Sequence, residues 1–187
     1  IDSKNNVLPS AVSFLRTGQV FSDETRKVFP VYCSREFCKK SNTKIVSLNY
    51  AVCNSDNEFI EFYNCSADTL STINKAWLDS EKSRFYKQYN YNVITCKTIT
   101  IDKLIQQYGT PDLIKIDVEG FEMEVLKGAK ELFNSGKVFL IIIELNGSGE
   151  EFGYTDNDIH MLISSYGFKP ISYNPKKREV YEINSPK

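Results

Sequence analysis

Three acidic side chains follow a short apolar run in the stretch LIKIDVEGFE, residues 113–122. They are Asp117, Glu119 and Glu122, and at this spacing their like charges repel, more strongly in apolar surroundings. Either a cationic group lies beside them or they point into water. A carboxylate in such a place can accept the proton of a hydroxyl, or can hold magnesium or calcium, which prefer oxygen ligands.

A second polar pair, Glu144 and Asn146, follows the apolar run FLIII at residues 139–143. The apolar runs fit buried strands, and the amphipathic stretches between them fit helices, which together predict a parallel sheet covered on both faces. Ligands bind beyond the carboxyl ends of the strands in such sheets. We therefore expect Asp117 and Glu144 to face one crevice as proton acceptors, with Asn146 as a neutral ligand or hydrogen-bond acceptor.

Structural explanations stay open for several neighbouring side chains. Glu119 and Glu122 also suit the first turn of a helix, where acids favour the helix dipole and cap free N–H groups. Lys115 can extend into water from a strand edge, or it can pair with Asp117 or Glu144. His160, in the helical stretch 156–168, is better explained as a packed or surface residue than as a catalytic base.

The rest of the sequence predicts the elements that must position these residues. Residues 92–109 predict a strand and then a helix, which Thr100 or Asp102 caps and Gly109 ends. Residues 43–54 and 58–65 predict two strands that pair antiparallel around a turn. The other expected elements are a helix end in 10–18, a helix in 34–40, a polar surface segment with Trp77 in 75–92, a strand in 111–117, one helix in 120–136, a strand in 137–146 and two final strands in 168–183.

Length and composition narrow the class of protein. The chain has 187 residues, which we interpret as a single domain, 1–187. With 23 basic and 24 acidic residues the net charge is -1, so neither nucleic acid nor an anionic membrane is expected as the main partner. Its longest apolar run is far too short to span a membrane. The oligomeric state is not encoded in any pattern of the sequence.

The cysteines bear on the compartment. They are five, an odd number, without a C-x-x-C pair, at positions 33, 38, 53, 65 and 96. This pattern favours reduced thiols in a reducing compartment such as the cytoplasm, with a secreted protein carrying one or two disulfides as the alternative. The chain starts at Ile1 without a methionine, so the sequence does not show where the protein is targeted.

The joint pattern KIDVEG, VLKGA and then a strand ending in IIELN resembles the FkbM family of S-adenosylmethionine-dependent methyltransferases. The segments KIVSLNYAVCNSDNEFIEFY, STI and VITCKTITIDKLI precede it in the family's order, so the resemblance extends from about Lys44 to Asn146. It implies a seven-stranded doubly wound sheet with antiparallel last strands. It also implies methyl transfer to a hydroxyl of a sugar or natural product. By position, Asp117 would lie beside the methyl-transfer centre, Glu144 and Asn146 would line the acceptor side, and Ser71 of the STI motif would contact the cofactor.

The N-terminal part departs from the family pattern. The family has a D-x-G-x-N-x-G turn whose backbone approaches the cofactor, and Asp2 and Asn6 keep its polar positions as candidate cofactor contacts. Lys4 and Leu8 replace the two glycines, and their side chains would crowd the cofactor. Glu24 would bind the ribose hydroxyls, or else is a solvated charge in a polar turn. The expected fold is therefore an α/β, doubly wound, mostly parallel Rossmann-like sheet with antiparallel C-terminal strands and a truncated or remodelled first strand.

Two functions of different kinds fit these residues. The first is an S-adenosylmethionine-dependent O-methyltransferase for a carbohydrate or other small hydroxylated acceptor, which the intact KIDVEG and IELN motifs favour. The second is a catalytically inactive methyltransferase-like domain that serves as a binding or assembly module. The missing glycines and first strand favour that alternative.

Overall fold

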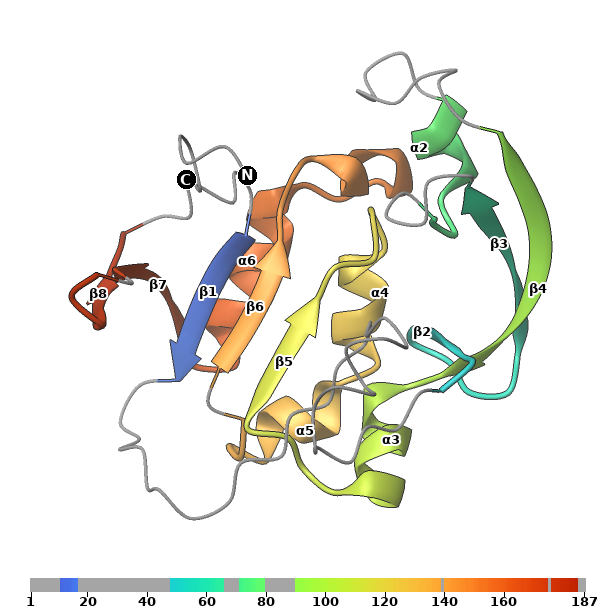
Figure 1. Cartoon of the computed structure of the whole chain (residues 1–187). Helices are drawn as coiled ribbons and strands as arrows, with labels where there is room; N and C mark the ends of the chain where they lie inside the picture. The colour runs from blue at the N-terminus through green and yellow to red at the C-terminus, as the bar shows by residue number, and fades with distance from the viewer. Residues whose placement is uncertain are drawn as a thin grey trace.

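The computed structural model describes residues 11–16, 48–65, 71–79, 90–138, 140–174 and 176–184. Their strands form two sheets, not the single sheet that the sequence suggests (Figure 1). The larger sheet has the order β5-β6-β1-β7-β8, and the smaller has the order β2-β4-β3. The strands are β1 (Ala11–Arg16), β2 (Ala51–Val52), β3 (Phe59–Cys65), β4 (Tyr91–Ile99), β5 (Leu113–Ile116), β6 (Leu140–Glu144), β7 (Phe168–Asn174) and β8 (Glu179–Glu182).

The larger sheet is mixed rather than mostly parallel. Its parallel pair is β5 with β6, whereas β1 runs antiparallel to both β6 and β7, and β8 runs antiparallel to β7. The prediction of a helix end in residues 10–18 was wrong, because Ala11–Arg16 forms a strand that pairs on both sides. The β7–β8 pair confirms the two final strands expected around the turn in 168–183.

Helices cover one face of the larger sheet in the part of the chain that the structure describes. Buried residues of α4 (Glu122–Lys127), α5 (Lys130–Asn134) and α6 (Asp156–Ser165) share one core cluster with those of β5 and β6, and Figure 1 shows α6 behind β1 and β6. Burial alternates along β6, where Ile141 and Ile143 are fully buried and their neighbours are half-buried. The core therefore lies between this face and the three helices, and helices on both faces, as expected from the sequence, are not seen among the described residues.

The single helix predicted for residues 120–136 is instead two helices, broken at Gly128 and Ala129. A Cβ atom on Gly128 would overlap the Cys53 carbonyl oxygen, so the chain passes against the smaller sheet at this point. Asp102 accepts hydrogen bonds from the backbone N–H groups of Glu131 and Leu132, both at 2.9 Å, and so caps α5. The preceding helix α3 (Ile101–Tyr108) is capped by Thr100 and ended by Gly109, as predicted.

The antiparallel pair predicted for residues 43–54 and 58–65 was wrong. Strands β2 and β3 lie on opposite sides of β4, parallel and antiparallel to it respectively. The turn between them passes around the end of β4, because the Cys53 N–H donates to the Ile99 carbonyl and the Asn57 N–H to the Thr98 carbonyl. Within 75–92 the structure describes α2 (Lys75–Asp79), but the Trp77 side chain and the helix predicted in 34–40 lie outside the described residues.

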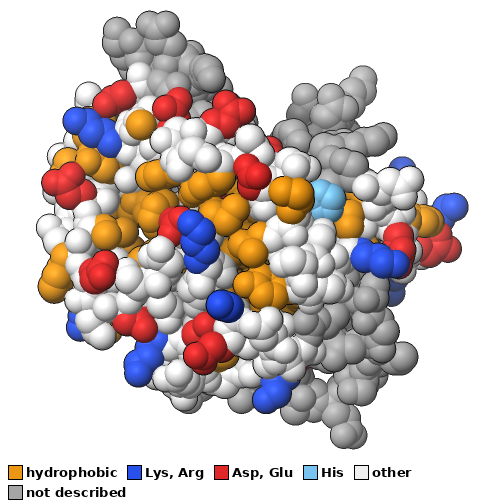
Figure 2. All heavy atoms as spheres, turned by 180° about the vertical axis from the view of Figure 1, so that it is seen from behind, with side chains coloured by type: hydrophobic (Ala, Val, Ile, Leu, Met, Phe, Trp, Pro, Cys, Tyr) orange, Lys and Arg blue, Asp and Glu red, His pale blue; other side chains and the backbone are white. Residues whose placement is uncertain are grey.

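The surface of the described residues carries charges of both signs, as the near-neutral net charge suggests (Figure 2). Figure 2 shows acidic and basic side chains mixed over the back of the molecule, without a large patch of one sign. None of the helices that the structure describes has the length and apolarity needed to cross a bilayer. Cys53 and Cys96 carry free thiols, Cys65 is buried at the end of β3, and Cys33 and Cys38 lie outside the described residues.

Candidate active site

The carboxyl ends of β5 and β6 bring three acidic side chains together. Because these strands are parallel, with Ile116 opposite Ile143, Asp117, which follows β5, and Glu144, the last residue of β6, lie at the same end of the sheet. One carboxylate oxygen of each, and one of Glu119, lie within 4.8 Å of one another. We call these three residues the carboxylate cluster. Its exposure grades from the exposed Asp117 through the half-buried Glu144 to the buried Glu119, so a ligand can enter from solvent.

Within the part of the chain that the structure describes, Lys115 partly balances this negative charge. The Lys115 ammonium forms an ion pair with Asp117, two residues further along the chain, and both side chains reach solvent. This is one of the two arrangements that the sequence left open for Lys115. Three carboxylates this close together suit a cationic ligand, whether a divalent metal bound through oxygen atoms or a positively charged organic group.

The backbone turn that carries Glu119 has an unusual conformation. Glu119 has a φ of 51° and Gly120 a φ of 103°. Glu119 therefore does not lie in a helical first turn, because α4 begins only at Glu122. The hydroxyl of Thr72 donates to the Glu119 carbonyl at 2.9 Å, and the phenol of Tyr154 donates to the Gly120 carbonyl at 3.1 Å.

The Glu122 carboxylate binds the N–H groups of the same turn. Its Oε1 accepts hydrogen bonds from the backbone N–H groups of Gly120, at 3.2 Å, and Val118, at 3.4 Å. Burial raises the pKa of Glu122 to about 7, although these hydrogen bonds favour the charged form. Burial also raises the pKa of the Tyr154 phenol, and the charges of Glu122 and Glu124 raise it further, so Tyr154 remains a hydrogen-bond donor.

The other predicted site residues are not part of the cluster. The Asn146 side-chain oxygen accepts from the Ser148 N–H at 3.0 Å and begins the 3-10 helix η2 (Ser148–Phe152). The Ser71 hydroxyl accepts from the Cys65 N–H at 3.1 Å, beside the end of β3. His160 lies on α6, half-buried. The three candidate cofactor contacts of the N-terminal part lie outside the described residues: Asp2, Asn6 and Glu24.

Sequence reasoning missed the residues that surround the turn. Thr72, Asn74 and Ser148 are almost fully buried polar residues, and Tyr154 is half-buried. The STI motif includes Thr72 and was a usable signal. No local pattern distinguished Asn74, Ser148 or Tyr154, because the contacts that matter are made to residues far away along the chain.

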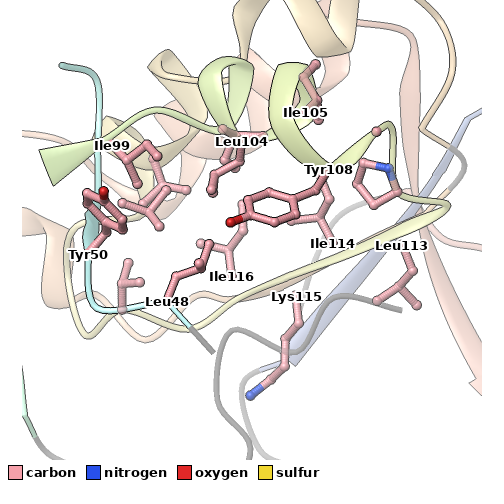
Figure 3. A pocket seen from close by; sticks show the side chains of 16 residues that line it. Leu48, Tyr50, Ile99, Leu104, Ile105, Tyr108, Leu113, Ile114, Lys115 and Ile116 are labelled. Carbon is pink, nitrogen blue, oxygen red and sulfur yellow. The ribbon is translucent and has the colours of Figure 1, made fainter. Parts of the chain in front are cut away.

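A separate apolar slot lies between the two sheets (Figure 3). Both β2 and β5 are edge strands of their sheets, and the slot runs between them with a cavity volume of about 140 Å³. In Figure 3 the Tyr108 ring projects into the slot, whereas the Lys115 amine points away from it. The slot reaches Val118, which follows Asp117, so apolar space adjoins the carboxylate cluster.

Comparisons with known proteins give a family match and a partial match to one protein. A family model described as "Methyltransferase FkbM domain" matches residues 15–170. The hexuronic acid methyltransferase AglP of Haloferax volcanii is 36% identical over 73 residues, which cover 38% of this chain and 28% of that protein. The chain thus matches less than a third of the length of this relative. No solved structure matches the chain.

Proposed function

The chain belongs to the FkbM methyltransferase family, and on that premise we propose that it is an S-adenosylmethionine-dependent O-methyltransferase. The proposed acceptor is a hydroxyl of a carbohydrate or another small molecule. The observation that carries the proposal is the carboxylate cluster at the ends of β5 and β6. The similarity to AglP, a hexuronic acid methyltransferase, supports the carbohydrate acceptor. In this proposal the chain is one domain, and its fold is a variant of the doubly wound Rossmann-like fold.

The carboxylate cluster fits a cationic methyl donor. When bound, S-adenosylmethionine supplies a methyl group on a positively charged sulfur. Asp117, Glu119 and Glu144 place three negative groups within 4.8 Å of one another, which favours a positive charge at this strand end. Asp2, Asn6, Glu24 and Ser71 remain the proposed contacts to the rest of the cofactor.

The acceptor hydroxyl must lose a proton as its oxygen gains the methyl group. Asp117 or Glu144 accepts that proton, since both stand at the solvent side of the cluster. The Lys115 ammonium forms an ion pair with Asp117 and so holds its carboxylate at the solvent side of the cluster. Asn146 lines the acceptor side, and its bond to Ser148 fixes the loop that follows β6.

The test combines binding and turnover. Calorimetry with S-adenosylmethionine and S-adenosylhomocysteine measures cofactor binding on the complete protein, and methylation of sugar acceptors measures turnover. We expect Asp117→Asn to lower kcat by about 10²-fold or more. Cofactor affinity should fall by a smaller factor, about fivefold, because one of the three negative charges near the donor is lost. The matched control is Glu131→Gln, which changes an exposed acid on α5 and leaves both values unaltered.

Two results would contradict the proposal. If no heat is measured at millimolar cofactor, the enzyme assignment fails and the inactive binding or assembly module takes its place. If Asp117→Asn and Glu144→Gln both turn over at the wild-type rate, neither carboxylate accepts the proton.

A further inference from the structure

Buried polar residues gather around the turn at Glu119 and Gly120. Apart from Thr98, the buried polar residues of the described chain are Thr72, Asn74, Glu119, Glu122 and Ser148. Burying such groups is unfavourable unless each finds a hydrogen-bond partner, so a cluster of them requires a specific set of contacts. Here these contacts converge on the backbone that carries one member of the carboxylate cluster.

The carbonyls of the turn are held by residues distant in sequence. Thr72 is 47 residues before Glu119, whose carbonyl it binds, and Tyr154 is 34 residues after Gly120, whose carbonyl it binds. The Thr72 hydroxyl also accepts from the Asn74 N–H at 2.9 Å, which orients its own proton toward the Glu119 carbonyl. Each hydroxyl therefore has a defined direction.

The packing leaves little freedom for another conformation. A Cβ on Gly120 would lie 2.7 Å from the Ser148 carbonyl oxygen and 3.0 Å from the Asn74 amide nitrogen. Asn74 in turn donates to that Ser148 carbonyl at 3.3 Å. The left-handed conformation of Glu119, which a residue with a side chain rarely adopts, persists because the surroundings determine it.

We propose that Thr72 and Tyr154 are positioning residues, whose hydroxyls hold the two carbonyls of this turn and so place the Glu119 carboxylate beside Asp117 and Glu144. This inference rests on the proposed methyl transfer. Without either hydrogen bond the turn relaxes toward a common backbone conformation, and the Glu119 carboxylate leaves the cluster. Misplacement of a catalytic group by about 1 Å can lower a rate by about 10²-fold.

The experiment uses variants that remove one hydroxyl at nearly constant shape. We expect Thr72→Val and Tyr154→Phe each to lower kcat by about 10- to 100-fold. Both variants should also raise the KM for S-adenosylmethionine, because the displaced Glu119 carboxylate no longer faces the positive charge of the donor. Thr72→Ser keeps the donor and should retain kcat within about threefold. Thr98→Val is the matched control, because Thr98 is equally buried and its hydroxyl accepts from the Glu58 N–H at 3.0 Å, away from the turn.

Crystal structures of the same variants give a readout that does not need activity. We expect the Glu119 carboxylate to move away from Asp117 and Glu144 in Thr72→Val, and to stay in Thr98→Val. An unmoved carboxylate, or an equal loss of kcat in Thr98→Val, would overturn the positioning role. If the wild-type protein methylates no acceptor, the proposed function fails, while the displacement of Glu119 still decides whether the two hydroxyls position it.

Discussion

Glu122 couples the stability of the turn to pH. Burial raises its pKa from 4.5 to about 7, so the folded state binds a proton that the unfolded state has already released between these values. The stabilisation from this protonated carboxyl is therefore complete below pH 4.5 and is lost as pH rises through 7. This difference between the pKa values of Glu122 in the folded and unfolded states corresponds to roughly 3 kcal/mol in the free energy of unfolding.

Glu122→Gln is expected to remove this pH dependence. Glutamine keeps an oxygen that can accept from the Gly120 and Val118 N–H groups but carries no titrating proton. Urea unfolding at pH 5, 6, 7 and 8 should show the variant gaining stability relative to wild type as the pH rises. Glu131→Gln, at an exposed position, provides the control. A constant difference between Glu122→Gln and wild type across this range would show that Glu122 does not titrate there.

At the level of single residues, the sequence predicts the cluster in part. The proximity of Asp117 and Glu144 was predictable, because the carboxyl ends of neighbouring parallel strands lie side by side. Glu119 was left undecided, since its place depends on a left-handed turn held by Thr72 and Tyr154. Those contacts span tens of residues, and a local pattern carries no information about them.

Among the elements, the break between α4 and α5 gives a direct test of packing. Gly128 has a φ of -77°, which alanine also adopts, so Gly128→Ala adds a methyl group without backbone strain. That methyl would overlap the Cys53 carbonyl oxygen. We expect a loss of about 2–3 kcal/mol in the free energy of unfolding, typical of overpacking against atoms that cannot move. Thermal and urea unfolding measure it.

The neighbouring helix offers a control for that prediction. Lys130→Ala changes an exposed side chain at the start of α5 and should alter stability by no more than about 0.5 kcal/mol. If Gly128→Ala lowers the free energy of unfolding as little as Lys130→Ala does, the end of α4 can move away from the Cys53 carbonyl at little cost. The contact between them would then not hold either segment in place.

The same contact explains why the sequence misjudged these elements. Apolar positions keep a helical period through 120–136, so a single helix was the reasonable prediction. The chain breaks that helix where it meets the turn after β2, and Asp102 supplies the cap for its second part. Likewise β2 and β3 lie on opposite sides of β4, because the turn between them forms backbone hydrogen bonds with the end of β4. Elements defined by local caps, such as α3 and α6, were predicted well.

For the whole molecule, the candidate site lies where the two sheets meet. Thr72, which forms an isolated bridge with Tyr63 of β3, contacts the turn after β5 of the larger sheet. The apolar slot separates the edge strands β2 and β5 close to the same point. A change in how the sheets pack would therefore alter the turn and the carboxylate cluster together.

Charge at this scale leads to a prediction about the acceptor. The chain as a whole is nearly neutral, with a net charge of -1, so long-range attraction of an anion is weak. Locally, the three carboxylates of the cluster repel an acceptor that carries its own carboxylate, and the Lys115 ammonium paired with Asp117 offsets part of this repulsion. At about 50 mM salt we expect kcat/KM for a neutral methyl hexoside to exceed that for the matching hexuronate by roughly tenfold.

Salt should narrow that difference, because the screening length falls from about 10 Å at 0.1 M to about 3 Å at 1 M. Methylation rates for both sugars, measured from 50 mM to 1 M sodium chloride, test this. The hexuronate rate should rise with salt while the rate for the neutral sugar stays nearly constant. A hexuronate that is preferred at low salt, and that loses rate as salt is added, would mean that basic groups bind its carboxylate. The carboxylate cluster would then face only the methyl donor and the reacting hydroxyl.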